Sequence, residues 1–317
     1  MHQIAIFGAA GTIGRWLGAE LDRRGVPFRA VGRNRAKLEA AFAGLTHASP
    51  VAADLADPDS AAAAARGADT IVYCVGVPYT EFALHPKLMQ VTVDAAAAAG
   101  VEHLVVVSSV YSYGVPQTRR VAETHPREPH TVKGRYRKEQ EDFALAAHGR
   151  GALRTMVVRL PDFYGPHAEN SLAHQVFSAA VAGKTANWLG PVSTPHEFVF
   201  APDTGPVIAG LAARPECYGQ AWNFGGPGEI SGGDFIQKVY LAAGHEPKFR
   251  TAGRGMLRLL GLFNPLMREL VEMLYLQETP VILDDSRLLA ALGNARKTPY
   301  DEGIRRTVEF LRAGAGA

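Results

Sequence analysis

The chain has 317 residues, of which 47% are hydrophobic and 20% are charged, as expected for a globular protein with a sizeable core. Its 33 basic and 31 acidic residues leave a formal net charge of +2, which gives no reason to expect a nucleic-acid partner. The two cysteines, Cys74 and Cys217, cannot form a disulfide framework, and no stretch approaches the roughly 18 apolar residues that span a membrane. We therefore expect a cytoplasmic protein with no membrane partner and no leader before its first strand.

The first predicted element is a short apolar strand, residues 3–7, which runs into three glycines spaced G-x-x-G-x-x-G and then into a helical pattern. A strand, a tight turn and a helix start in this order form a pyrophosphate site for a dinucleotide. Gly8 permits the turn, Gly11 leaves room for the phosphates, and Gly14 allows close packing of the helix on the strand. The helix start, at Thr12 and Ile13, offers unpaired N–H groups and a partial positive charge to the anion. The alternative is a glycine-rich turn that binds no ligand.

The second predicted strand, residues 27–31, ends in Gly32 and Arg33. When the cofactor is NAD, an acidic residue usually holds the ribose 2′-hydroxyl at the end of this strand. A carboxylate would repel a 2′-phosphate, whereas a guanidinium can pair with it through two hydrogen bonds. The sequence therefore favours NADP(H) over NAD(H), the alternative being that Arg33 is only a surface cation.

The following segments alternate between short apolar strands and helices of ordinary length. Strands are predicted at 51–55, 69–76, 103–107 and 154–160, and helices at 59–66, 84–99 and 133–148. This alternation predicts an α/β fold with a doubly wound parallel sheet, the NAD(P)-binding Rossmann fold. Ligands of such sheets bind beyond the carboxyl ends of the strands. Residues predicted at those ends are Gly8, Arg33, Asp54, Gly76 and Ser109.

Beyond residue 165 the regular alternation weakens, so we predict a dinucleotide-binding domain over 1–165 and a smaller, mainly substrate-binding lobe over 166–317. Returns to the sheet are expected near 195–225. Helical patterns lie near 171–182, 203–213, 231–243, 284–292 and 299–312. Residues 256–276 are apolar but interrupted at Asn264 and Pro265, which predicts two helices separated at the proline. Core packing is the expected role of this segment, with a membrane-surface or dimer role as alternatives.

The motifs together resemble those of the extended short-chain dehydrogenase/reductase superfamily, of the NAD-dependent epimerase/dehydratase type. The matching residues are the glycine triplet, Asp54-Leu55, Ser108-Ser109 with Tyr113-Gly114, the run from Arg159 to Pro166, and residues 298–304. The resemblance implies that Ser109 hydrogen-bonds a substrate oxygen. It also implies that Asp54 and Leu55 hold the adenine, that Cys74, Val75 and Gly76 lie along the cofactor, and that Pro161 and Phe163 border the nicotinamide.

The sequence departs from this family where the family carries Tyr-x-x-x-Lys at the start of the helix after the long loop, residues 110–131. The family often has a glutamate four residues after its lysine, and here Glu141 matches it. That register places Lys133 at the tyrosine and Arg137 at the lysine. A shift by one residue gives Gly134 and Lys138 instead, so neither register restores the motif.

Lys133 and Arg137 are four residues apart and therefore share one face of the predicted helix. Arg137 can replace a lysine as the cation near the nicotinamide ribose, whereas Lys133 is a poor acid–base substitute unless its surroundings disfavour its charged form. Tyr113 is a further candidate for proton transfer, along with Tyr111 and Tyr164. The alternative is that the helix start is only a basic surface and that the proton-transfer machinery is lost.

The sequence therefore predicts an NADP(H)-dependent oxidoreductase or epimerase-like enzyme, with Ser109, Lys133, Arg137 and Tyr113 as candidate catalytic residues. The expected partner is a small carbonyl, hydroxyl or sugar-type substrate, and a homodimer is an open alternative. The eleven histidines follow no zinc-binding pattern, so no metal site is expected. The competing hypothesis is an NAD(P)-binding sensor or scaffold that keeps the nucleotide site but has no turnover.

Overall fold

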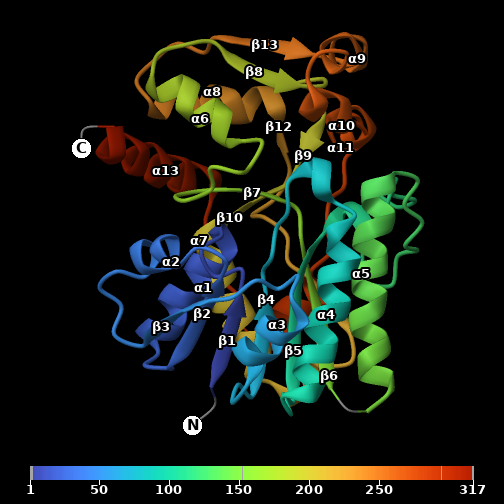
Figure 1. The fold of residues 1–317 in the computed structure, drawn as a ribbon. Coiled ribbons are helices and arrows are strands. Elements are labelled where there is room, and N and C mark those ends of the chain that lie inside the picture. The colour runs from blue at the N-terminus through green and yellow to red at the C-terminus, as the bar shows by residue number, and fades with distance from the viewer. Residues whose placement is uncertain (1–2, 152, 294, 316–317) are drawn as a thin grey trace.

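The structure is a computed structural model that describes residues 3–151, 153–293 and 295–315. Its centre is a parallel sheet of seven strands in the order β11-β6-β5-β4-β1-β2-β3 (Figure 1). The strands are β1 (Ile4–Phe7), β2 (Phe28–Gly32), β3 (Ala48–Ala52), β4 (Thr70–Tyr73), β5 (His103–Ser109), β6 (Arg154–Leu160) and β11 (Ala221–Asn223). The chain runs from β1 outward to β3 and then crosses back to β4, beside β1. This confirms the predicted doubly wound sheet, whose switch point lies between β1 and β4.

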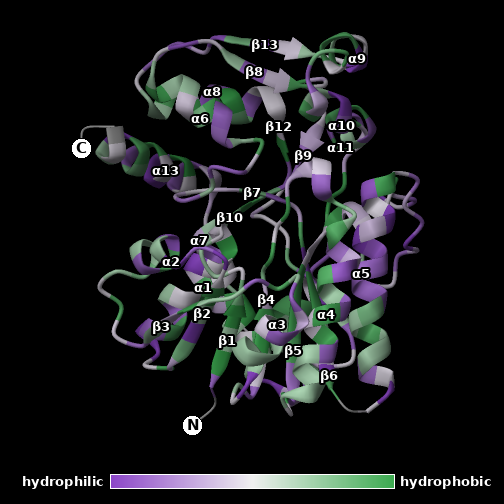
Figure 2. Ribbon diagram, in the orientation of Figure 1, coloured by the Kyte–Doolittle hydropathy of each residue, from purple (hydrophilic) through white to green (hydrophobic). Residues whose placement is uncertain are grey.

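Helices cover both faces of the sheet. They are α1 (Thr12–Arg23), α2 (Arg35–Ala41), α3 (Pro58–Ala65), α4 (Leu84–Ala98), α5 (Val132–Gly149), α7 (Ala201–Ala212) and α12 (Ser286–Leu292). Successive strand side chains point to opposite faces, so Ile6 packs in one apolar cluster with α1, α7 and α12, while Phe7 packs in the other with α3, α4 and α5. Figure 2 shows the sheet strands as largely hydrophobic, which suits strands covered on both sides.

Two boundaries differ from the sequence prediction. The third strand was expected at 51–55 but spans Ala48–Ala52, because Ala56 N–H donates to the Asp54 side chain and Asp57 caps α3, which bends the chain out of the strand. Asp54 and Leu55 therefore follow β3 rather than complete it. Helix α2, which was not predicted, begins where Asn34 accepts a hydrogen bond from Lys37 N–H.

A second group of elements lies above the carboxyl ends of the sheet strands in Figure 1. It contains β7 (Asp162–Tyr164), α6 (His174–Val181), β8 (Ala186–Leu189), β9 (Pro195–His196), β10 (Phe198–Phe200), β12 (Ile230–Ser231), α8 (Gly232–Ala242), β13 (Phe249–Ala252) and α13 (Tyr300–Ala315). Its core is aromatic, with the Tyr164 ring stacked on Phe177 and edge-on to Phe235. Because α7, β11 and α12 pack with the sheet, this part of the chain is interleaved between both groups, and the domain boundary at 165 stays a prediction.

The apolar segment near 256–276 forms α9 (Arg254–Gly261), α10 (Pro265–Met273) and the short α11 (Tyr275–Glu278). As predicted, two helices are separated at the proline. The Asn264 side chain caps α10 by accepting hydrogen bonds from Leu266 and Met267 N–H. Short 3-10 turns occur at Tyr79–Glu81, Val110–Ser112 and Pro215–Cys217. Within the described ranges, none of the helices combines the length and the apolar character needed to cross a bilayer.

Candidate cofactor and active site

The glycine-rich turn between β1 and α1 has the geometry that its spacing predicts. Gly8 has a φ of +81°, and a Cβ at Gly8 would lie 2.9 Å from the Cys74 backbone, so both conformation and space call for glycine. A Cβ at Gly14 would lie 2.6 Å from Ala9 O, so Gly14 is needed for the close packing of α1 on the turn. The turn thus brings the start of α1 to the carboxyl ends of β1 and β4.

The start of α1 can hold an anion. Gly11 is the N-cap and provides no side-chain cap, and the first turn carries no acidic residue. A Cβ at Gly11 would approach only Gly8 O, at 3.2 Å, so the space in front of the helix is open. The N–H groups of Thr12 and Ile13 have no acceptor within the helix, which leaves them for a ligand. These residues fit the pyrophosphate of a dinucleotide.

The ends of β2, β3 and β4 line the rest of this edge. Arg33 is exposed after β2 and, among the described residues, makes no hydrogen bond or ion pair, whereas neighbouring Arg35 pairs with Glu39. Asp54 is exposed and Leu55 is buried after β3. After β4, Cys74 and Val75 are half-buried and Gly76 is exposed, with open space around its Cα. The structure thus brings all of the residues assigned to the cofactor on these strands to one edge.

The two serines at the end of β5 differ in their contacts. Ser108 Oγ donates to Glu141 Oε1 at 2.5 Å, within a buried network. Ser109 Oγ is buried but has no hydrogen-bond partner among the described residues. An orphaned buried hydroxyl is costly, so its presence favours a ligand oxygen as the missing partner. Of the two serines, Ser109 is thus the one whose hydroxyl has no partner among the described residues, and its contact with a substrate oxygen stays a prediction.

Helix α5 turns Lys133, Arg137 and Glu141 into the protein, since each is less than a tenth exposed. Arg137 Nη1 donates to His85 Nδ1 at 3.1 Å, and Arg137 Nη2 donates to Val107 O at 3.3 Å. Burial and the neighbouring Arg137 lower the pKa of His85 to about 2, so the imidazole is neutral and accepts the hydrogen bond. The guanidinium of Arg137 is thereby held beside β5, two residues before Ser109.

Lys133 has a different environment from the expected one. Its Nζ donates to Glu269 and, at 2.7 Å, to Glu272 Oε1, both on α10. The same Nζ lies 5.9 Å from the ring centroids of Tyr79 and of Phe82. The register placed Lys133 at the family's tyrosine, but its ammonium group is bound by carboxylates that no sequence motif connected to it. Its contacts make it a link between α5 and α10.

Tyr113 does not have the setting of a proton donor. It is fully buried, its hydroxyl donates to Asn223 Oδ1 at 2.7 Å and accepts from Arg159 Nη1 at 2.8 Å, and burial raises its pKa. Arg159 in turn pairs with Glu141 at 2.7 Å. Tyr164 lies in the aromatic core, and burial raises its pKa too. These contacts point to a structural role for Tyr113 and Tyr164, in place of the expected proton transfer.

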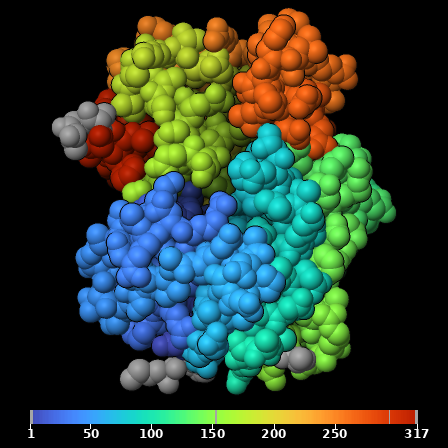
Figure 3. Space-filling model, viewed as in Figure 1, coloured from blue at the N-terminus to red at the C-terminus, as the bar shows by residue number. Residues whose placement is uncertain are grey.

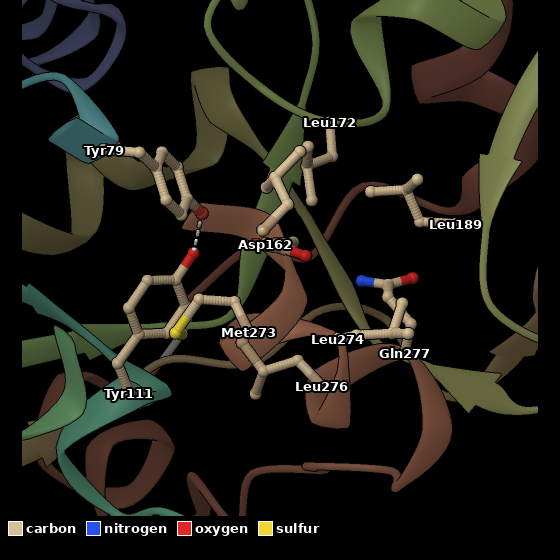
Figure 4. A pocket seen from close by; sticks show the side chains of 10 residues that line it. Tyr79, Tyr111, Asp162, Leu172, Leu189, Met273, Leu274, Leu276 and Gln277 are labelled. Carbon is tan, nitrogen blue, oxygen red and sulfur yellow. Dashed lines mark hydrogen bonds between the residues drawn. The ribbon is translucent and has the colours of Figure 1, made fainter. Parts of the chain in front are cut away.

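A small pocket beyond the end of β6 gathers polar groups that the sequence analysis did not assign. The hydroxyls of Tyr79 and Tyr111 are 2.6 Å apart, and Figure 4 shows Asp162 between this pair and Gln277. Burial raises the pKa of Asp162 to about 6, and the Asp162 charge helps to raise the pKa of both tyrosines. The remaining lining is apolar: Leu172, Leu189, Leu270, Met273, Leu274 and Leu276. The pocket therefore holds an ionisable carboxyl in an apolar setting.

The signal for this pocket was present in the sequence but incomplete. Asp162 stands between Pro161 and Phe163, the pair that the resemblance places beside the nicotinamide, and the structure has Pro161 buried and Phe163 half-buried at the start of β7. Tyr79 lies in the short 3-10 turn that follows β4 in the chain. Residues of α10 and α11 come from far along the chain, where no motif pointed to this edge. In the part of the chain that the structure describes, no group of three or more metal-ligating side chains comes together.

Comparisons with known proteins agree with this geometry. Residues 8–158 match a family model described as NAD(P)H-binding. The UDP-glucose 4-epimerase of Mycolicibacterium smegmatis is 27% identical over 226 residues, which cover 69% of this chain and 65% of that protein. The match thus spans slightly less than two thirds of the length of this relative.

Solved structures resemble the chain over nearly its whole length. They include the dTDP-glucose 4,6-dehydratase DesIV of Streptomyces venezuelae with NAD bound (TM-score 0.82, 21% identity, 99% of this chain and 98% of that one). The UDP-glucuronic acid 4-epimerase of Bacillus cereus in complex with NAD has a TM-score of 0.80 at 15% identity, over 98% and 99% of the two chains. Residues 8–158 thus match the NAD(P)H-binding model, and the chain has the fold of these NAD-bound dehydratase and epimerase structures.

Proposed function

We propose that the protein is an NADP(H)-dependent oxidoreductase or epimerase-type enzyme that transfers a hydride to or from a small carbonyl or hydroxyl compound. The observation that carries this proposal is the pocket beyond β6, where Asp162 and the Tyr79–Tyr111 pair lie beside Pro161 and Phe163. A carboxyl whose pKa is near 6 can give and take a proton near neutral pH. The pocket thus contains the group that the missing Tyr-x-x-x-Lys motif would otherwise supply.

The cofactor would be held along the sheet edge. The α1 start would bind the pyrophosphate, Arg33 the 2′-phosphate, and Asp54 with Leu55 the adenine. Arg137 would supply the positive charge near the nicotinamide ribose. When bound, the nicotinamide would donate or accept the hydride. The exposed and unpaired state of Arg33 supports NADP(H), because a guanidinium without a protein partner is available to a phosphate.

Protons would be exchanged through Asp162. In its neutral form the carboxyl donates a proton to the substrate oxygen as the carbonyl carbon is reduced, and the carboxylate takes that proton back in the reverse direction. Tyr79 and Tyr111 keep their protons, since burial raises the pKa of both hydroxyls. The hydrogen bond between the two hydroxyls uses one of these protons, so one tyrosine can donate to the reacting oxygen, as can the unpaired Ser109 hydroxyl.

The pocket lining favours a substrate with an apolar flank. Leucine and methionine side chains from three separate parts of the chain line the pocket around Asp162. Besides Asp162 and the two tyrosines, the lining has one other polar side chain, Gln277. A sugar ring presents hydroxyls on every side, and each would need a partner when buried. A ketone, aldehyde or secondary alcohol with an apolar substituent matches this lining better than a sugar does, but the pocket has room for only about one water molecule, so its α10 and α11 wall would have to move for such a compound to enter.

A specific observation supports the second hypothesis, a sensor or scaffold without turnover. Lys133 binds Glu269 and Glu272, and α10 with α11 contributes Leu270, Met273 and Leu274 to the wall of the pocket. A permanent closure of this kind would allow the nucleotide to bind while it kept a substrate out.

The test is NADPH oxidation by the purified protein with a panel of aldehydes and ketones, and NADP+ reduction with UDP-glucose, whose secondary hydroxyl groups would supply the hydride. We expect turnover with an apolar carbonyl compound, lost in Asp162→Asn and kept in the control Asp94→Asn, which changes an exposed carboxylate on α4. Tight NADPH binding without turnover across the panel would favour the sensor. Failure to bind NADPH or NADH would overturn both functions.

A further inference from the structure

One corner of the surface collects exposed apolar side chains. Ten large hydrophobic side chains are exposed among the described residues, and seven of them lie between 249 and 266. They are Phe249, Met256, Leu259, Leu260, Leu262, Phe263 and Leu266. The side chains of Leu262 and Phe263, between α9 and α10, are the most exposed of the set, at 74% and 87%. Exposed apolar side chains gathered in one segment in this way mark an interaction site more often than scattered ones do.

The same segment is strongly basic. Residues 247–268, here called the α9–α10 tip, contain five basic residues (Lys248, Arg250, Arg254, Arg258 and Arg268) and no Asp or Glu. Arg254 pairs with Glu278, and Arg250 donates to Asn187. Arg258 and Arg268 are exposed, and their guanidinium groups make no hydrogen bond or ion pair to any described residue. The tip therefore presents apolar side chains together with free positive charge.

The tip is an ordered part of the fold. Leu257 is 1% exposed, so α9 has an inner apolar side as well as its outer one. A Cβ at Gly261 would lie 3.1 Å from Arg268 Cα, which means that α9 and α10 approach each other closely. Figures 1 and 3 show the segment at a corner of the molecule, away from the central sheet. The exposed apolar side chains are thus held outward by packed helices.

We propose that the α9–α10 tip docks on the surface of a bilayer that contains anionic lipids. Leu262, Phe263 and the outer side of α9 would enter the boundary between headgroups and acyl chains, and Arg258 with Arg268 would face the lipid phosphates. A helix that is amphipathic, basic and too short to span lies in the plane of the interface. This mode of contact is compatible with the lack of a spanning helix among the described residues.

Charge argues against a second copy of the chain as the occupant. Pairing the tip with the same tip of another copy would bring five basic residues from each side together, with no acidic residue in either tip. An anionic surface supplies the opposite charge that the tip lacks. Helix α10 also carries Leu270 and Met273 on its inner side, so a docked tip would place the pocket close to the lipid surface.

The experiment is flotation of the full chain with vesicles of phosphatidylcholine alone and of phosphatidylcholine mixed with phosphatidylglycerol, at low and high salt. We expect binding to the anionic vesicles that weakens as salt rises. The double variant Leu262→Ser/Phe263→Ser should lower the partition coefficient at least about tenfold. Arg258→Glu/Arg268→Glu should abolish the preference for anionic vesicles.

Leu241→Ser is the matched control, because Leu241 is an exposed leucine on α8, outside the tip. It should bind vesicles as the unchanged protein does, and all variants should melt at similar temperatures. Absence of vesicle binding by the unchanged protein overturns the proposal. So does a concentration-dependent dimer, seen in sedimentation, that the Leu262→Ser/Phe263→Ser variant dissociates, since the tip would then be an interface between copies. Neither readout depends on turnover or on the proposed reaction.

Discussion

Lys133 Nζ donates a hydrogen bond of 2.7 Å to Glu272 Oε1, and this contact joins α5 to α10 across 139 residues of sequence. Glu269 shares the same ammonium group, and Glu272 Oε2 also accepts from Val132 N–H at 2.8 Å. The lysine side chain is 2% exposed, whereas the two glutamate side chains are 30% and 28% exposed. The positive charge from α5 is therefore buried, and the negative charges from α10 stay in partial contact with solvent. This contact ties α10, which lines the pocket, to α5.

Lys133→Met should loosen α10 without damage to the sheet. The substitution keeps the apolar stem but leaves two carboxylates without their cation, which should lower the free energy of unfolding by about 1–3 kcal/mol. Trypsin should cut faster at Arg258 and Arg268, as mapped by mass spectrometry. Lys238→Met is the control, since Lys238 pairs with exposed Asp301. Equal digestion rates for Lys133→Met and the unchanged protein would refute a fixing role for the lysine.

Gly11→Val should abolish NADP(H) binding while the fold survives. Gly11 has a φ of −73°, which valine tolerates, and its Cβ would meet only Gly8 O, so the branched side chain would occupy the space where the phosphates lie. Gly14→Val is the contrasting variant, because its Cβ would collide with the Ala9 backbone and should reduce stability itself. Fluorescence titration with NADPH and thermal melting distinguish the two. Unchanged affinity in a folded Gly11→Val protein would remove the cofactor assignment.

Arg33→Ala should weaken NADPH much more than NADH. A charge-assisted contact to the 2′-phosphate contributes on the order of 1.5–3 kcal/mol, so the NADPH dissociation constant should rise by roughly one to two decades. Arg35→Ala is a matched control, because Arg35 is close in sequence, exposed and paired with Glu39. The measurement is a titration of each variant with both cofactors. Equal losses for both, or a preference of the unchanged protein for NADH, would contradict phosphate recognition by Arg33.

The sheet could be predicted from the sequence because its signals are local. Each strand is a short apolar run and each helix follows at ordinary length, so the order of elements determines the topology. The parallel pair β8 and β13 was not predicted, since Ala186–Leu189 and Phe249–Ala252 are four residues each and partly exposed. Runs this short carry no clear periodicity, and their pairing joins segments some sixty residues apart.

The candidate site could be predicted only where its residues act through the backbone or stand at strand ends. The position of Gly8, Arg33 and Ser109 at the carboxyl edge of the sheet was predicted from their place after a strand, and their functional roles stay predictions. The side-chain partners of Lys133 and Tyr113 were not predicted, because a side chain's partner depends on which distant element packs against it. Glu272 and Asn223 supply those partners from the second half of the chain. The same reason explains why Asp162 stood in a recognised motif without a role.

Asp162→Asn should increase stability near neutral pH while it removes turnover. Burial raises the pKa of Asp162 from 3.8 to about 6, so between these values the folded protein binds more protons than the unfolded chain. Stability from this group therefore falls as pH rises through that window, and above pH 6 the buried carboxylate opposes folding. This shift of the Asp162 pKa lowers the free energy of unfolding above pH 6 by at most about 3 kcal/mol. The asparagine variant should thus exceed the unchanged protein in free energy of unfolding at pH 7 and match it below about pH 4.

Urea unfolding at a series of pH values measures this difference. Glu197, whose pKa burial raises to about 7, titrates in both proteins and cancels in the comparison. In the direction of carbonyl reduction, the rate of the unchanged enzyme should fall as pH rises through about 6, since the neutral carboxyl is the donor. The asparagine variant should have no turnover at any pH and should retain NADPH affinity. A variant with full turnover and the same pH profile would show that another group moves the proton, and a variant no more stable at pH 7 would show that the Asp162 carboxylate is well solvated in the folded protein.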